Sequence, residues 1–229
     1  MSHRLLLVED DPRIRELVAG YLESKGFHVE SVADGTTAVD RIRDLQPDLV
    51  ILDWMLPGED GLSVCRRARE HYRGPILMLT ARNDEIDEIV ALEVGVDDYL
   101  AKPVRPRLLL ARVTALLRRV TIDVADGEQR LVLGELVVDA SQRTVVVAGV
   151  EVILTTAEFE LVWYLASHAG SPRTRDDLFQ ELRGIEYDGL DRSMDMRVSQ
   201  VRKRLSEADP QTRDWIKTVR GVGYQMVRA

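Results

Sequence analysis

Short apolar runs alternate with amphipathic stretches through the first 119 residues, and this alternation limits the possible folds more than any other feature of the sequence. The runs are too short for helices and lack polar residues at every second position, which is typical of strands buried on both faces. Five strand and helix units in succession predict an α/β doubly wound fold, with a parallel sheet between two layers of helices. The predicted strands are 5–8, 29–32, 49–52, 76–79 and 99–100, and the predicted helices are 12–25, 36–45, 62–72, 84–94 and 106–119.

The rest of the chain has a different organisation. Residues 120–130 are acidic and have little apolar periodicity, so we predict a linker there between one domain of residues 1–119 and another of residues 131–229. Residues 131–138 and 144–154 have the pattern of antiparallel strands. Helices are predicted at 155–168, 174–183 and 192–207, followed by a β-hairpin at 215–226. This order of elements predicts an α+β winged helix-turn-helix domain.

The distribution of charge bears on the partner of the second domain. A net charge of −8 argues, taken alone, against a nucleic-acid partner. Residues 192–229, however, carry nine Lys and Arg against four Asp and Glu. A basic segment at the end of an acidic chain can face DNA phosphates, although a solvated charged surface would have the same composition.

Composition excludes several classes of protein. With 45% hydrophobic and 31% charged residues the chain is expected to be globular, and no apolar run approaches the roughly 18 residues of a membrane span. The start lacks the apolar segment of a secretion signal, so we expect a cytoplasmic protein. The single cysteine, Cys65, falls among apolar positions at helical spacing, and we expect a buried, inert thiol.

Three acidic residues stand at the ends of predicted strands: Glu9 and Asp10 after the first, and Asp53 after the third. In a doubly wound sheet ligands bind beyond the carboxyl ends of the strands, where strand order reverses, so these side chains should converge. Three unpaired carboxylates repel one another, and a hard divalent cation with oxygen ligands, such as Mg²⁺, relieves that repulsion. The sequence therefore predicts a metal site.

A metal-bound aspartate can also be a nucleophile toward phosphate, because the cation offsets the charge that repels the incoming group. Thr80 ends the fourth predicted strand with a hydroxyl, and Lys102 ends the fifth with an ammonium that can pair with phosphoryl oxygens. Each residue alone is weak evidence, since an Asp at a strand end is more often a helix cap. Five polar residues at the correct strand ends together indicate a phosphoryl-binding site.

These residues carry a resemblance to the receiver domains of two-component response regulators, which have the flavodoxin-like form of this fold. The resemblance implies that Asp53 accepts a phosphoryl group from a phosphohistidine on a sensor histidine kinase, in a chain whose own chemistry is limited to that transfer and slow hydrolysis. It also implies Mg²⁺ held by Glu9, Asp10, Asp53 and the Met55 carbonyl, a switch made by Thr80, Tyr99 and Lys102, and a cis Lys102-Pro103 bond. The matching strings are Val8 to Asp11, Pro47 to Gly58, Asp60-Gly61, Leu79 to Arg82, Gly95 to Tyr99 and Lys102-Pro103.

Residues 131–229 resemble the effector domain of the OmpR/PhoB family, a winged helix preceded by a small sheet. The segment from Arg183 to Ser193 is similar in particular to the RstA subgroup. The resemblance implies a transcription regulator that binds double-stranded DNA, forms a homodimer on phosphorylation and works with RNA polymerase. The matching strings are Gly134 to Asp139, Leu154 to Leu161, Arg175 to Leu178, Asp191 to Asp195, Val201 to Leu205 and Thr218 to Tyr224.

The predicted helix at 192–207 has two populations of residues. Met194, Val198, Val201 and Leu205 recur on one apolar face, suited to packing. The other side is available to DNA. Candidate base contacts are Ser193, Met196, Arg197 and Gln200, and candidate phosphate contacts are Arg192, Arg202, Lys203, Lys217 and Thr218. Arg220, beside two glycines in the hairpin turn, could enter the adjacent minor groove.

Two departures from the family pattern affect these expectations. Gln200 stands where many relatives have an arginine, which favours an adenine contact over a guanine contact. The family's receivers often pair through salt bridges, and Asp97, Asp98 and Arg112 match positions that contribute to a dimer face. Glu88 and Leu108 occupy places where a basic and an acidic residue are usual, and Leu108 could compensate by apolar contact.

Two further interpretations are open on the sequence alone. A constitutive regulator of the same architecture would dimerise without phosphate, although the intact set of acidic residues, Thr80 and Lys102 counts against it. A metal-dependent phosphohydrolase would use Asp53 as its nucleophile, but it needs a second acid to activate water and a substrate pocket. Neither is evident in the sequence.

Overall fold

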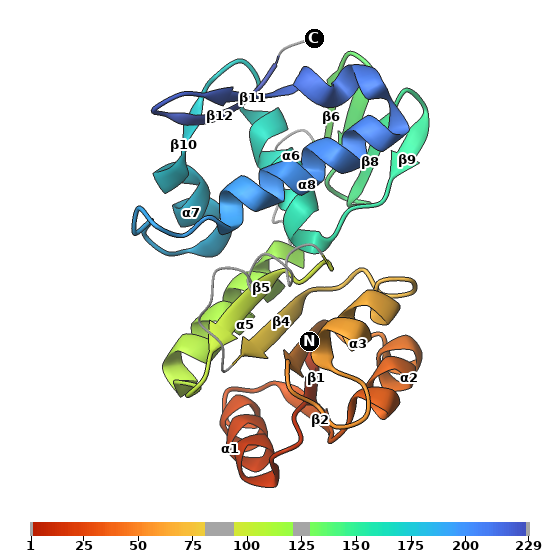
Figure 1. Ribbon diagram of the computed structural model, residues 1–229, viewed down its shortest axis with the longest axis vertical. Coiled ribbons are helices and arrows are strands. Elements are labelled where there is room, and N and C mark those ends of the chain that lie inside the picture. Colours follow the sequence, from red (N-terminus) through yellow and green to blue (C-terminus); the bar gives the residue numbers. More distant parts are fainter. Residues whose placement is uncertain (1, 81–93, 121–128, 228–229) are drawn as a thin grey trace. The chain divides into compact units, whose positions relative to one another are not determined.

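The structure is a computed structural model that describes residues 2–80, 94–120 and 129–227 (Figure 1). The chain divides into two compact units, Met1–Val120 and Thr121–Ala229. The predicted linker falls at this division, but Val120 is the last residue of a helix and Arg130 is the first residue of a strand. The helix predicted at 84–94 lies almost wholly outside the described residues.

The first unit contains a five-stranded parallel sheet with the order β2-β1-β3-β4-β5, which confirms the doubly wound fold. Strand order reverses between β1 and β3, because the chain adds β2 on one side of β1 and the later strands on the other. The strands are β1 Arg4–Val8, β2 His28–Val32, β3 Leu49–Asp53, β4 Ile76–Thr80 and β5 Asp98–Ala101, and the helices are α1 Pro12–Glu23, α2 Gly35–Leu45, α3 Gly61–Ala68 and α5 Pro106–Val120.

Two hydrophobic cores cover the two faces of this sheet, which is why its central strands are continuous apolar runs. Successive residues of a strand point to opposite faces. Leu5 and Leu7 therefore pack with α1 and α5, whereas Leu6 and Val8 pack with α2 and α3. Cys65 of α3 belongs to the second of these cores and is fully buried, as expected from its position in the sequence.

The second unit is a four-stranded antiparallel sheet followed by a winged helix, which confirms the predicted order of elements. One core joins the sheet to the helices, with Val138 and Val145 packed together with Phe159 of α6, Phe179 of α7 and Val198 of α8. In the wing, β12 pairs with both β11 and β10. The elements are β6 Arg130–Leu133, β7 Leu136–Asp139, β8 Thr144–Val147, β9 Val150–Val152, α6 Thr156–Ser167, β10 Arg173–Thr174, α7 Arg175–Arg183, α8 Ser193–Ala208, the 3-10 helix η1 Pro210–Asp214, β11 Ile216–Val219 and β12 Gly223–Met226.

Individual residues determine where the helices of this unit begin and how the wing attaches. Thr155 and Glu158 form the predicted capping box of α6, in which each side chain accepts a hydrogen bond from the other residue's backbone N–H. Thr174 caps α7 in the same way. Gly223 pairs closely with β10, and a Cβ atom there would lie 2.1 Å from the Arg173 carbonyl oxygen. The wing therefore requires a glycine at this position.

Candidate functional site

The three predicted acidic residues converge where strand order reverses. Glu9 and Asp10 follow β1, and Asp53 is the last residue of β3, so the parallel pairing of these strands brings the carboxylates to one edge of the sheet. One carboxylate oxygen from each residue lies within 4.8 Å of the others, at a spacing that could hold a metal ion. Glu9 and Asp53 are buried and Asp10 is exposed, so the cluster opens to solvent on one side.

Lys102 completes this acidic pocket from the segment after β5. Its Nζ lies 2.8 Å from Glu9 Oε2 and 2.9 Å from Asp53 Oδ2. The Lys102-Pro103 peptide bond is cis, as the resemblance implied. Two of the three carboxylates thus share one ammonium, and the cluster of four side chains retains an excess of negative charge.

The pKa values of the pocket reflect this crowding. Burial raises the pKa of Glu9, Lys102 lowers it by a hydrogen bond, and the charge of Asp53 raises it again; the net direction is upward. Burial lowers the pKa of the Lys102 ammonium, but its hydrogen bonds to Glu9 and Asp53 outweigh that effect and the pKa is raised. A set of oxygen ligands with excess negative charge suits a hard divalent cation.

The other predicted residues of the pocket come from neighbouring strands. Thr80 ends β4 and is buried, and its carbonyl accepts a 2.7 Å hydrogen bond from the Lys102 backbone N–H. Tyr99 of β5 lies opposite Met78 of β4 and is partly buried against the core shared with α2 and α3. The Met55 side chain is exposed beyond the end of β3. The structure therefore brings Glu9, Asp10, Asp53 and Lys102 into one cluster, with Thr80 joined to it through the backbone.

Sequence reasoning missed an apolar groove beside this pocket. The groove, of about 190 Å³, lies between α1 and the start of α5, and Leu17 on its rim is 64% exposed. An apolar residue on the outer side of an amphipathic helix is the signal that could have found it. The groove is lined by Ile14, Leu17, Val18, Tyr21, Lys102, Pro103, Val104, Pro106 and Leu109.

The structure corrects part of the predicted dimer face. Asp97 is 0% exposed, and its carboxylate accepts hydrogen bonds from Arg69 at 2.5 Å and from the Ile76 backbone N–H at 2.8 Å. Asp97 is therefore an internal residue that joins α3 to the sheet, and the prediction that it lies on an exposed dimer face is wrong. Asp98 is also buried and pairs with Arg112 of the same chain at 3.1 Å.

The part of Leu108 in a dimer face stays a prediction. Leu108 is 39% exposed on α5, and an apolar contact with a second chain requires such exposure. Glu88, the other departure from the family pattern, lies outside the described residues.

The predicted apolar face of α8 is confirmed, because Met194, Val198, Val201 and Leu205 are all fully buried. A second correction concerns its other side. Ser193 and Arg197 are each only 4% exposed, so the prediction that both lie on the exposed side of the helix is wrong.

The surroundings of Ser193 give the physical reason. The Ser193 hydroxyl accepts a 2.9 Å hydrogen bond from Arg183 of α7, which holds the start of α8 inward. Arg197 follows one turn later on the same side of the helix.

Four of the remaining candidates line an open groove of about 870 Å³ between α8, η1 and β11: Arg202, Lys203, Lys217 and Thr218. Arg202 connects the walls of this groove by donating 2.9 Å hydrogen bonds to the Ile216 carbonyl and the Thr218 hydroxyl. Arg213 of η1 also lines it, and sequence reasoning missed this residue. Of the candidates, Arg192, Lys203, Lys217, Thr218 and Arg220 are exposed, and Met196, Gln200 and Arg202 are partly buried.

An acidic pocket with a lysine at the reversal of a doubly wound sheet, in one chain with a winged helix, defines the class of response regulators that act on DNA. The comparisons with known families agree. Residues 5–114 match the family described as response regulator receiver domain, and residues 149–226 match the family described as transcriptional regulatory protein, C terminal. The chain belongs to the response regulators of the OmpR/PhoB type.

Transcriptional regulatory protein RstA of Escherichia coli strain K12 is 42% identical over 231 residues, which cover 96% of this chain and 95% of that protein. The resemblance to the RstA subgroup is thereby confirmed. The solved structure of the response regulator DrrB, a Thermotoga maritima OmpR/PhoB homolog, is 30% identical and covers 99% of this chain and 100% of its own, with a TM-score of 0.51. A mutant of RitR, 24% identical over the whole of both chains with a TM-score of 0.78, shares the fold.

These findings define a response regulator of a two-component system, with a receiver domain and an OmpR-type DNA-binding domain. Within the described residues, no helix is both long enough and apolar enough to cross a membrane.

Proposed function

We propose that Asp53 is the phosphoacceptor and that it takes a phosphoryl group from a phosphohistidine of a sensor histidine kinase. The observation that carries this proposal is the convergence of the Glu9, Asp10 and Asp53 carboxylates within 4.8 Å, with Lys102 bonded to two of them. One Asp53 oxygen attacks the phosphorus atom while the bond from phosphorus to the histidine nitrogen breaks, so the ring leaves with the electron pair. Lys102 stays beside the new phosphoryl group and pairs with its oxygens.

Mg²⁺ is the cofactor that this set of ligands fits, because it prefers carboxylate, carbonyl and water oxygens. Asp10, Asp53 and the Met55 carbonyl would hold it, with Glu9 contributing directly or through water. When bound, Mg²⁺ supplies positive charge that offsets the repulsion between the pocket and the incoming phosphoryl group.

The phosphoryl group adds about 1.5 to 2 negative charges to a pocket that is already acidic. Thr80 and Lys102 carry the hydroxyl and the ammonium that can follow it. A movement of Thr80 leaves space for Tyr99, which comes from the adjacent strand β5. The population then shifts toward a state with an altered face on β5 and α5, where Leu108 is exposed, and this face forms a homodimer.

The second unit binds promoter DNA through α8 and the wing. Met196 and Gln200 are the proposed base contacts in the major groove, with adenine favoured for Gln200. The exposed Arg192, Lys203, Lys217 and Thr218 are proposed to contact phosphates, and Arg220 to enter the minor groove. Arg202 holds the wing against α8 and contacts phosphate from the edge of the groove.

We place this function in the cytoplasm, where the DNA is, and RNA polymerase is the proposed partner of the DNA-bound dimer. A homodimer presents two copies of α8, so its binding site consists of two half-sites.

The test is incubation of the full-length chain with Mg²⁺ and a small-molecule phosphoryl donor, with Asp53→Asn as the matched control. Mass spectrometry should find one phosphoryl group on the wild-type chain and none on the variant, and phosphorylation should raise both dimer formation and affinity for DNA selected from random sequence. Phosphorylation without a change in affinity would instead support a constitutive regulator. Many turnovers of donor per chain would support a phosphohydrolase.

A further inference from the structure

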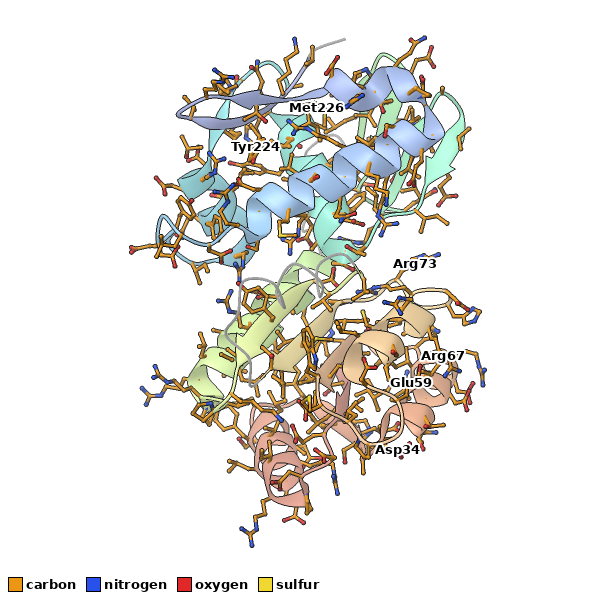
Figure 2. The ribbon with its side chains drawn as sticks, viewed as in Figure 1. Asp34, Glu59, Arg67, Arg73, Tyr224 and Met226 are labelled. Atoms are coloured by element: carbon orange, nitrogen blue, oxygen red, sulfur yellow. The ribbon has the colours of Figure 1, made fainter. Side chains whose placement is uncertain are left out.

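Asp195, in the first turn of α8, lies where three elements of the second unit meet. One of its oxygens, Oδ1, accepts a 2.6 Å hydrogen bond from the Tyr224 hydroxyl and a 2.9 Å hydrogen bond from Arg175 Nε. Tyr224 belongs to β12 of the wing and is labelled in Figure 2, and Arg175 is the first residue of α7. The other oxygen, Oδ2, lies 3.0 Å from Arg192 Nε. The two oxygens of one carboxylate thus have different partners.

The hydrogen bonds that Oδ1 accepts connect parts of the second unit to one another. Arg175 lies over the Tyr224 ring at 5.2 Å and also donates to the Tyr224 hydroxyl at 3.4 Å. Burial, then the hydrogen bond to Asp195, raises the pKa of Tyr224 to about 12. These contacts hold the wing and α7 against the start of the helix proposed to enter the major groove.

The Oδ2 side faces the surface. The Arg192 side chain is 69% exposed, and its position precedes Met196 and Lys203 at helical spacing. Arg192 therefore belongs to the side of α8 that is proposed to meet DNA. A carboxylate bonded to that arginine offsets one positive charge at a place where phosphates are expected.

We infer that Asp195 is a positioning residue that limits how strongly the chain binds DNA of any sequence. It keeps the wing and α8 together through Oδ1, and through Oδ2 it holds Arg192 so that a DNA phosphate must compete with a carboxylate for that side chain. Affinity for DNA of any sequence depends on the number of phosphates that the protein neutralises. Each neutralised phosphate adds about 0.9 to the steepness with which log affinity falls as log salt concentration rises. The inference rests on the proposed DNA-binding surface.

The decisive variant is Asp195→Asn in the full-length chain. The amide oxygen can keep the bonds to Tyr224 and Arg175, whereas the NH₂ group that then faces Arg192 cannot accept a hydrogen bond. Arg192 is released with little change to the wing. For a mixed-sequence DNA duplex, the slope of log affinity against log salt concentration should become steeper by about 0.9. The ratio of the variant's affinity to the wild type's should therefore increase about 3.5-fold when the salt concentration falls from 200 to 50 mM.

A double-mutant cycle separates this effect from a structural one. Arg192→Gln should change the salt slope by less than about half of 0.9 in the wild-type chain, where Asp195 already holds the arginine, but by the full 0.9 in the Asp195→Asn chain. Asp214→Asn is the control, because Asp214 lines the groove between α8, η1 and β11 and its neutralisation should have the same effect with or without Arg192.

The inference is overturned if Asp195→Asn leaves the salt slope unchanged or weakens mixed-sequence binding, or if its effect persists in the Arg192→Gln chain. Should Asp195→Asn fail to fold, Arg192→Gln alone decides: a loss of the full 0.9 in the slope means that Asp195 does not hold the arginine. A wild-type chain that binds no duplex at any salt concentration overturns the DNA-binding function as well, which distinguishes the two failures.

Discussion

Replacing Lys102 with methionine tests the electrostatic account of the acidic pocket. The change removes an ammonium that lies within 2.9 Å of both Glu9 and Asp53 while keeping an unbranched side chain. Breaking a buried ion pair by removing one partner costs about 3–5 kcal/mol, because the remaining charge is left buried and unpaired. The Lys102 side chain is 18% exposed, and solvent reaches the pocket at Asp10. We therefore expect the lower end, about 3 kcal/mol.

The same substitution should strengthen the binding of Mg²⁺. An ammonium and a divalent cation about 5 Å apart repel each other by about 1.7 kcal/mol even at the dielectric constant of water. Removing that repulsion corresponds to an affinity about tenfold or more higher, since 1.4 kcal/mol is a factor of ten. Loss of stability without metal and gain of affinity for metal are thus expected together.

Native-state hydrogen exchange of β1 and β3 in the full-length chain measures the first effect. A loss of about 3 kcal/mol makes exchange of these core strands about a hundredfold faster. Calorimetric titration with Mg²⁺ measures the second. Lys25→Met is the control, because Lys25 is an exposed lysine of the same unit and should change neither quantity appreciably. Unchanged exchange in Lys102→Met without Mg²⁺, or weaker Mg²⁺ binding, would refute the reasoning.

Three further substitutions probe other parts of the chain. Thr155→Ala removes the cap of α6 and should lower the free energy of unfolding, measured in urea titrations, by about 1–2 kcal/mol. An unchanged value would mean that the capping box does not stabilise the domain. Gly223→Ala places a Cβ 2.1 Å from the Arg173 carbonyl, so it should lower the free energy of unfolding by about 1–3 kcal/mol and weaken DNA binding. The control is Gly20→Ala, which has open space around it and should raise the free energy of unfolding by about 0.5–1 kcal/mol. Leu17→Asp places a charge on the exposed apolar groove beside Lys102, and because such a groove suits contact with a protein partner, the variant should accept phosphate more slowly from a sensor kinase but not from a small donor; equal slowing of both would refute a kinase contact there.

Strands buried on both faces were the most predictable part of the fold. β1, β3 and β4 are continuous apolar runs because both faces of the sheet are covered, and such runs are visible without any knowledge of tertiary contacts. The acidic pocket was predictable for the same reason. Once the strands are parallel, their carboxyl ends share an edge, and the acidic residues at the ends of β1 and β3 must lie near one another.

The role of Asp97 could not be predicted from the sequence. Asp97 and Asp98 are adjacent and identical in type, yet the first pairs with Arg69, which follows α3 directly, and the second with Arg112 of α5. Neighbouring residues at the start of a strand point in opposite directions, and which acid faces which arginine depends on the packing of α3 and α5. Arg69 is 28 positions away in the chain, so no local pattern connects it to Asp97.

For α8, the sequence predicted correctly which apolar residues are buried, but not which polar residues beside them are exposed. Met194 and Val198 mark the buried side, and Ser193 and Arg197 each precede one of them at the flank of that side. Helical periodicity cannot assign a flanking polar residue to solvent or interior. For Ser193 the outcome depends on Arg183, a residue of the preceding helix that approaches only in the folded domain.

Because Cys65 is buried, cysteines introduced elsewhere in the chain can be labelled selectively. It is the single cysteine of the sequence, it is fully buried, and burial raises the pKa of its thiol to about 11. Because the thiolate is the form that reacts with maleimides, these reagents will not react appreciably with Cys65 near neutral pH. Cysteines introduced on the surface of each unit can therefore carry a pair of fluorophores without prior removal of a native thiol. Energy transfer between them would report whether incubation with a phosphoryl donor changes the distance between the two units.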